Sequence, residues 1–242
     1  MTFKDIKEQS FALFKTNFGK CTAASLTVFF IKAALALLIL TFQLVSMKLF
    51  GMQCINGLAS VVFYLLYLLT YVFIFMPLNF GKSLMAVKIA NGENVSTDSI
   101  FECFKENYFY CLGLKLRQAI ATLGVLFLVI VVFASVYTFG VNPVYIITGG
   151  VAVSLILLAV YALRYSALAN TAIVCGMQDV NITMRKAVRT ARKNKHIVFS
   201  LLCTMAGWIL LSLITCGIGF LFLGFYINIS VKKYYLINER GF

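Results

Sequence analysis

Charged residues are scarce in this sequence. Only 12% of its 242 residues are Asp, Glu, Lys or Arg, whereas soluble domains carry roughly 25%. Hydrophobic residues make up 62%, and they gather in long runs that do not alternate as the strands of a membrane barrel would. A water-soluble core of this size could not bury so much apolar surface. The composition therefore predicts an all-α polytopic membrane protein.

Residues that support catalysis are also few. The one histidine, His196, lies in a basic run, with no serine nucleophile motif beside it. Metal sites need clusters of His, Cys or carboxylates, and the eight acidic residues do not form one with His196. The Gly217-Ile218-Gly219 turn lacks the third glycine of a nucleotide-binding fingerprint. We expect neither an enzyme nor a bound cofactor or metal.

The seven cysteines include no Cys-x-x-Cys pair. Their number and spacing therefore indicate neither a zinc site nor a disulfide framework. Only Cys54 and Cys216 fall near the predicted outer face, and a bridge between these two is left open.

The hydrophobic residues form six segments of the length that crosses a bilayer, for which about 20 residues are needed. We expect these segments to be helices, because lipid cannot form hydrogen bonds with backbone N–H and C=O groups. The first twenty residues are charged and aromatic, and so are not expected to form a secretory signal. The six segments pair as three hairpins: 21–46 with 55–78, 118–139 with 144–163, and 197–214 with 218–235.

The basic residues fall almost entirely on one side of these segments. Of the 21 Lys and Arg, all except Lys32 and Lys48 lie before, after or between the hairpins or, as Lys232 and Lys233 do, at the inner end of the sixth segment. The positive-inside rule assigns that side, with both chain ends, to the cytoplasm. Nucleic-acid binding is not expected, although the net charge is +13, because the cations are divided among four segments that border lipid. The short last hairpin either spans the bilayer or is re-entrant, and full spanning is favoured, because Trp208 and the apolar run after Gly219 show no polar residues that would line a cavity.

A short marker recurs before each hairpin, as Lys15-Thr16-Asn17, Lys105-Glu106-Asn107 and Arg192-Lys193-Asn194. Apolar residues at helical spacing precede each marker, which predicts a cytoplasmic amphipathic helix before each hairpin. We expect the second and third of these helices to start near Ser96 and at Asn181, residue types that cap helices. The spacing suggests a threefold repeat (1–80, 81–165, 166–242) within one membrane domain, 1–242. The alternative is that membrane boundaries produce such patterns without repetition.

The third amphipathic helix is the most basic. Its six cations are not accompanied by an acid, and clusters of this kind attract anionic lipid at about 1 kcal/mol per charge. They indicate either an anionic-lipid contact site or only a topology anchor. The six are Arg185, Lys186, Arg189, Arg192, Lys193 and Lys195.

Lys32 lies within the first hydrophobic segment. An ionisable residue inside a membrane is costly and often marks a functional site. Matching depth along the helices brings Lys32 level with the stripe Tyr64, Tyr67 and Tyr71 of the second segment, which predicts an intramembrane polar site. The alternative is that Lys32 extends its ammonium to the inner surface.

Residues 164–238 resemble a bacterial family known only as domain of unknown function 975. That resemblance implies a multi-helix protein of the bacterial cytoplasmic membrane, and it implies no established activity. It rests on Asp179, Ala187, Arg192-Lys193-Asn194-Lys195-His196, Phe199, Gly207-Trp208, Leu210-Leu211, Thr215, Gly217-Ile218-Gly219, Tyr226 and Tyr234-Tyr235.

Two functional classes follow from these patterns. The first is a non-enzymatic accessory or interaction protein, whose basic inner face contacts the anionic headgroups of the bilayer and whose partner is another membrane protein. The second is a small transporter or lipid-handling protein, in which Lys32 and the tyrosine stripe line a path. The absence of acidic relays and of proline breaks inside the segments favours the first class.

Overall fold

The computed structural model describes residues 3–50, 60–105, 107–138, 163–177, 179–205 and 218–240, with 149–150, 153–154, 156–157, 160–161, 207 and 212. All regular structure in these residues is helical, which confirms the all-α prediction. The chain forms two compact units. Unit 1 comprises residues 1–112 and 205–242, and unit 2 comprises residues 113–204.

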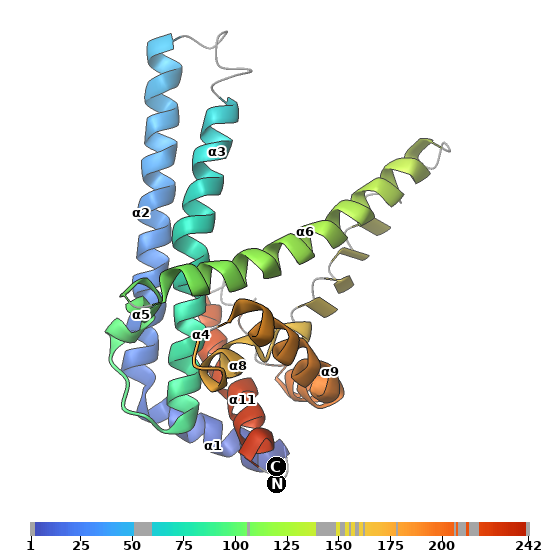
Figure 1. Cartoon of the computed structure of the whole chain (residues 1–242). Helices are drawn as coiled ribbons and strands as arrows, with labels where there is room; N and C mark the ends of the chain where they lie inside the picture. Colours follow the sequence, from blue (N-terminus) through green and yellow to red (C-terminus); the bar gives the residue numbers. More distant parts are fainter. Residues whose placement is uncertain are drawn as a thin grey trace. The chain divides into compact units, whose positions relative to one another are not determined.

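Unit 1 is organised around the helix α4 (Met76–Asn91), against which α11, α1 and the 3₁₀ helix η3 pack. The helices α2 and α3 lie side by side and run in opposite directions (Figure 1). The elements around α4 are α1 (Phe3–Thr16), α2 (Phe18–Phe50), α3 (Ser60–Thr70), the π-helix η2 (Tyr71–Phe75), η3 (Thr97–Phe101), α5 (Glu102–Lys105), the start of α6 (Tyr108–Thr138), and α11 (Ile218–Arg240).

The second hydrophobic segment does not end at residue 78, because α3, η2 and α4 follow one another without a break. Pro77 lies in the first turn of α4. A proline there has no N–H to give to the carbonyl four residues earlier, which belongs to Phe73, and its ring crowds that carbonyl. The chain widens into η2 just before Pro77, and the Tyr108 hydroxyl donates to the Phe73 carbonyl at 2.9 Å. Together these changes let the helix pass the proline.

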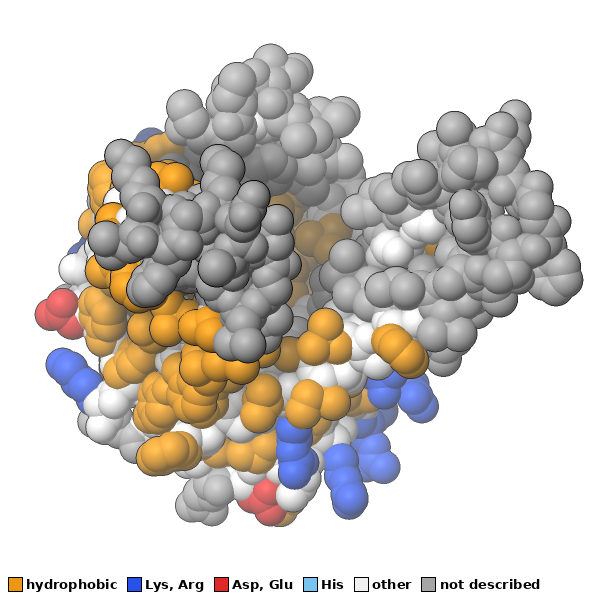
Figure 2. Space-filling view, turned by 90° about the horizontal axis from the view of Figure 1, so that it is seen from above, with side chains coloured by type: hydrophobic (Ala, Val, Ile, Leu, Met, Phe, Trp, Pro, Cys, Tyr) orange, Lys and Arg blue, Asp and Glu red, His pale blue; other side chains and the backbone are white. Residues whose placement is uncertain are grey.

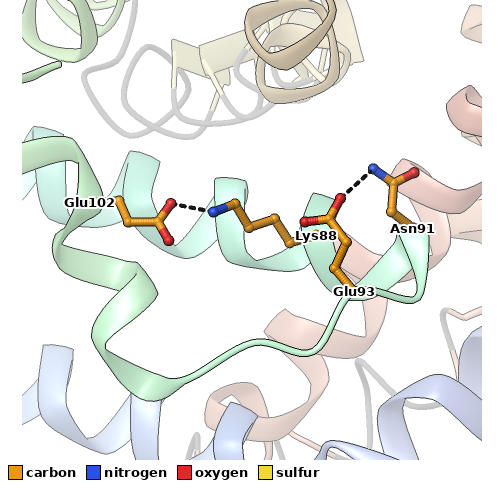
Figure 3. Close-up of polar contacts among 4 residues, drawn as sticks. All are labelled: Lys88, Asn91, Glu93 and Glu102. Carbon is orange, nitrogen blue, oxygen red and sulfur yellow. Dashed lines mark hydrogen bonds and ion pairs between the residues drawn. The ribbon is translucent and has the colours of Figure 1, made fainter. Parts of the chain in front are cut away.

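The far end of α4 is held by a cap and by two polar contacts. Gly92 adopts φ +82°, and its N–H donates to the Ile89 and Lys88 carbonyls. A left-handed residue in this place closes a helix, and glycine takes that conformation without strain. The Lys233 ammonium of α11 donates to the Ala90 carbonyl at 3.2 Å. One turn before the cap, Lys88 of α4 forms an ion pair with Glu102 of α5 at 2.6 Å (Figure 3).

The helix α1 is amphipathic, as predicted before the first hydrophobic segment. Ile6, Ser10 and Phe14 recur every four residues and are buried, while Phe11 and Phe14 contact the ring of Tyr226 on α11. The apolar side of α1 therefore packs on protein. The second predicted amphipathic helix is instead two short pieces, η3 and α5.

Only two helical stretches among the described residues are long and apolar enough to cross a membrane, Phe18–Phe42 and Leu65–Asn91. The described residues thus do not support six transmembrane helices. The third, fourth and fifth predicted segments include positions outside the described part of the chain. The sixth corresponds to α11, which carries Asn228, Lys232 and Lys233 and buries one side against α4 and α1.

Unit 2 contains the rest of α6, α8 (Leu168–Val174) and α9 (Val180–Thr204). Asp179 caps α9, because its carboxylate accepts the N–H groups of Asn181 at 2.7 Å and Ile182 at 3.5 Å. The helix therefore starts at Val180, and its cap is Asp179 instead of the expected Asn181. The Asn181 side chain accepts a hydrogen bond from Arg117 of α6 instead.

Burial around the three marker asparagines follows one pattern. The residue seven positions before each asparagine is buried, as are the residues four and seven positions after it. The side-chain amides of Asn17 and Asn194 each donate to the carbonyl four residues earlier, and the Asn17 and Asn107 carbonyls accept the N–H four residues later. The threefold repeat itself stays a prediction. The buried triplets are Ser10, Cys21, Ala24; Ile100, Cys111, Leu114; and Ala187, Val198, Leu201.

Candidate functional site

The strongest candidate site is the cationic side of α9. The sequence of this helix contains no Asp or Glu. Thr183, Ala187, Ala191, Asn194 and Val198 form its buried stripe, which leaves the basic residues on the opposite, exposed side. Like charges three or four residues apart repel one another and destabilise a helix slightly. The buried stripe and the Asp179 cap hold the helix despite this repulsion.

Four of the six predicted lipid-contact residues line one hollow of about 620 Å³. They are joined there by a fifth cation, Arg164, and by three other side chains. Lys193 and Lys195 are exposed on the same helix and do not line the hollow. We call this hollow the basic pocket. Its lining is Arg164, Tyr165, Met184, Arg185, Lys186, Val188, Arg189 and Arg192.

Arg164 is the site residue that sequence reasoning missed. It lies at the end of the fourth predicted segment, and its guanidinium lies 5.8 Å from the ring centres of both Tyr161 and Tyr165. Contacts of this kind fix the position of a cation without cancelling its charge. The two tyrosines placed four residues apart beside an arginine were the available signal. They do not by themselves indicate that Arg164 lies beside α9 and lines the same hollow.

The basic pocket has an uncompensated charge. None of its five cations forms an ion pair with an acid within the described residues, where the ion pairs are Lys4–Glu8 and Lys88–Glu102. Four of the five are arginines, whose planar forks bind carboxylate or phosphate in a bidentate manner. Such a lining is suited to a phosphate-bearing anion, with the apolar side chains of Met184 and Val188 beside it.

The predicted intramembrane site is arranged differently from the expectation. The Lys32 ammonium donates to Asn79 at 2.9 Å, eight residues beyond Tyr71. Tyr67 and Tyr71 are exposed, and the side chain of Tyr64 lies outside the described residues. The second helix continues through Pro77, so Asn79, which lies further along it, reaches Lys32.

The remaining reactive side chains do not gather into a metal site. Among the described residues there is no group of three or more His, Cys, Asp or Glu that could hold a metal ion, and His196 is exposed on α9. Cys103 and Cys111 are buried, and a hydrogen bond with Cys103 lowers the pKa of the Cys111 thiol. Cys54 and Cys216 lie outside the described residues.

Comparison with family models, curated proteins and solved structures finds no match to this chain. The resemblance to domain of unknown function 975 accordingly stays a prediction.

Proposed function

We propose that this chain is a non-enzymatic accessory protein of the bacterial cytoplasmic membrane, whose basic pocket binds anionic lipid headgroups on the inner leaflet. The observation that carries the proposal is the pocket itself, in which five cations meet without an acid among the described residues. Arg164 follows a predicted membrane segment directly, so the pocket lies where headgroups would be.

Membrane insertion is supported by the exposure of apolar side chains. In Phe18–Phe42, only 17% of the most apolar stretch is buried, and in Leu65–Asn91 only 28% of the corresponding stretch is buried. A core helix of a soluble protein would be mostly buried. Figure 2 shows broad areas of exposed hydrophobic side chains, which would be strongly unfavourable in water and are favourable in lipid.

The proposed topology has six hydrophobic segments arranged as three hairpins, with both chain ends in the cytoplasm. For the last hairpin, the packing of α11 supports the re-entrant form. Phe225 lies against Lys82, and Lys233 reaches Ala90, so α11 runs alongside α4 in the same direction. Only residues 218–224 of α11 extend beyond Phe225, about 10 Å at 1.5 Å per residue, which is too short to cross a bilayer.

The proposed function predicts that phosphatidylglycerol stabilises the purified protein through the basic pocket. The full chain in a neutral detergent would be titrated with phosphatidylglycerol or with phosphatidylcholine while its melting temperature is recorded. The double variant Arg189→Gln/Arg192→Gln should bind phosphatidylglycerol roughly 30-fold more weakly, because each lost charge removes about 1 kcal/mol.

A matched control comes from the same helix. The double variant Lys193→Gln/Lys195→Gln removes the same charge from positions outside the pocket and should keep most of the response. Equal losses in the two variants would mean that the response is a general surface-charge effect. Equal stabilisation by both lipids would refute headgroup recognition.

The surroundings of Lys32 favour the accessory function over the transporter alternative. Its path required Lys32 to face the tyrosine stripe, whereas Lys32 is bonded to Asn79 and both described tyrosine side chains are exposed.

A further inference from the structure

A second group of cations lies in unit 1, where α2 and α4 face each other. The Lys32 ammonium of α2 donates to Asn79 of α4 at 2.9 Å. In the opposite sense, the Lys82 ammonium of α4 donates to the Ser25 hydroxyl of α2 at 3.4 Å. Ser25 and Lys32 are two helical turns apart, and Asn79 and Lys82 are one turn apart, so all four residues lie along one seam.

The part of the chain that the structure describes supplies neither ammonium of this seam with a counter-charge. Their hydrogen-bond acceptors are a neutral amide and a neutral hydroxyl. Each ammonium also lies over an aromatic ring, Lys32 at 5.8 Å from Phe75 and Lys82 at 5.0 Å from Phe225. Within the described residues no acid pairs with either one. Both side chains are partly buried, so water screens their charges incompletely.

The burial along α2 places the seam at a boundary. Up to Val28, α2 has buried positions that pack into unit 1; beyond it, Phe29, Phe30, Leu37 and Leu38 are exposed. From Lys32 to the end of α2 at Phe50 the helix rises about 27 Å, close to the roughly 30 Å of a hydrocarbon core. In the proposed topology, Lys32 and Lys82 therefore lie at the inner headgroup layer.

We propose that Lys32 and Lys82 form a phosphate-binding site, with Asn79 positioning Lys32 and Ser25 positioning Lys82. A phosphate oxyanion held by the two ammonium groups would supply the missing counter-charge. The same chemistry is offered by the phosphate of an anionic lipid headgroup and by free inorganic phosphate. This site rests on the membrane placement in the proposed function, and not on the basic pocket of α9.

The first test compares two double variants of the full chain in neutral detergent. Lys32→Gln/Lys82→Gln should weaken phosphatidylglycerol binding at the seam roughly 30-fold, at about fivefold per charge, and should leave the lipid bound at the basic pocket. The control Lys15→Gln/Lys20→Gln removes two cations from the same unit and should retain binding. Bound lipid would be counted by native mass spectrometry at a series of lipid concentrations. Unchanged binding in Lys32→Gln/Lys82→Gln overturns the proposal.

The source of the phosphate is decided by a parallel titration. Inorganic phosphate would replace lipid, with chloride at matched ionic strength as the reference, and the melting temperature would be recorded. A response to phosphatidylglycerol alone assigns the site to a lipid headgroup. A response to both, lost in Lys32→Gln/Lys82→Gln, assigns it to phosphate in general. No response to either overturns the proposal.

A further variant remains informative if the double variant does not fold. Asn79→Asp places a carboxylate at hydrogen-bond distance from Lys32 and so supplies the counter-charge from within the chain. It should raise the melting temperature of the lipid-free protein and reduce the additional rise caused by phosphatidylglycerol. A lower melting temperature with an undiminished lipid response would overturn the proposal. The Arg189→Gln/Arg192→Gln variant should keep lipid binding at this seam. The result for the basic pocket can therefore be told apart from the result for the seam.

Discussion

Gly81 lies where α4 meets η3, and it allows the closest contact between these helices. A Cβ atom on Gly81 would overlap the carbonyl oxygen of Ile100, which is backbone and cannot rotate away. A side chain at position 81 would therefore push η3 from the core.

We predict that Gly81→Ala destabilises the protein by about 1–3 kcal/mol, as other overpacked cores do. The loss would be measured as the change in melting temperature in detergent. Gly19→Ala is the control, because a Cβ atom on Gly19 meets no atom within 4 Å. Equal melting temperatures for Gly81→Ala and Gly19→Ala would contradict the close contact.

The Tyr108 hydroxyl donates a hydrogen bond to the Phe73 carbonyl. Pro77 has no N–H to donate to that carbonyl in the helical pattern. We predict that Tyr108→Phe costs about 1 kcal/mol, the usual net value of one hydrogen bond. In a Pro77→Ala background the residue at position 77 again has an N–H, so Tyr108→Phe should cost less there. A double-mutant cycle of melting temperatures measures this coupling. Independent, additive effects would show that Tyr108 does not compensate for the proline.

At the scale of elements, α9 shows what the sequence could predict. Its buried stripe recurs at helical spacing between cations, so both its existence and its basic side could be predicted from residues 181–195 alone. Its cap was misplaced, because Asp179 and Asn181 are both capping residue types and only the packing against Arg117 separates their roles.

The pairing of elements was not predictable in the same way. Lys32 was matched to the tyrosine stripe on the assumption that the second segment ends at residue 78. The continuation of α3 through η2 into α4 depends on the contact from Tyr108, which is 31 residues beyond Pro77 in the chain. A long-range contact of this kind has no local pattern, and the same holds for the contribution of Arg164 to the basic pocket.

The end of α9 provides a test of membrane insertion through two native cysteines. Cys203 is exposed on α9 within the fifth predicted segment, and Cys175 lies in the turn after α8. Thiol alkylation requires the thiolate and therefore water. In single-cysteine variants in inside-out vesicles, we predict that an impermeant maleimide labels Cys175 and leaves Cys203 unlabelled until detergent is added. Equal labelling of both in intact vesicles would place residues 197–204 in water.

At the scale of the whole molecule, the two proposed phosphate-binding sites lie in different units, the basic pocket in unit 2 and the Lys32–Lys82 seam in unit 1. The predicted repeat gives a reason for such duplication. Asn17 and Asn194 each donate a side-chain hydrogen bond to the carbonyl four residues earlier, as a repeated local plan would predict. The cations of the two sites differ, since α9 carries its own while unit 1 uses α2 and α4.

In the proposed topology, the length of α2 beyond Lys32 would couple this protein to its lipid. Bilayers built from long acyl chains would draw the Lys32 ammonium into hydrocarbon, whereas short chains would leave the upper turns of α2 in contact with water. A mismatch between the length of the helix and the thickness of the hydrocarbon core costs fractions of a kcal/mol per Å. That cost is enough to make a protein prefer membranes of one thickness over another. Acyl-chain length would then set how readily the proposed Lys32–Lys82 site holds an anion.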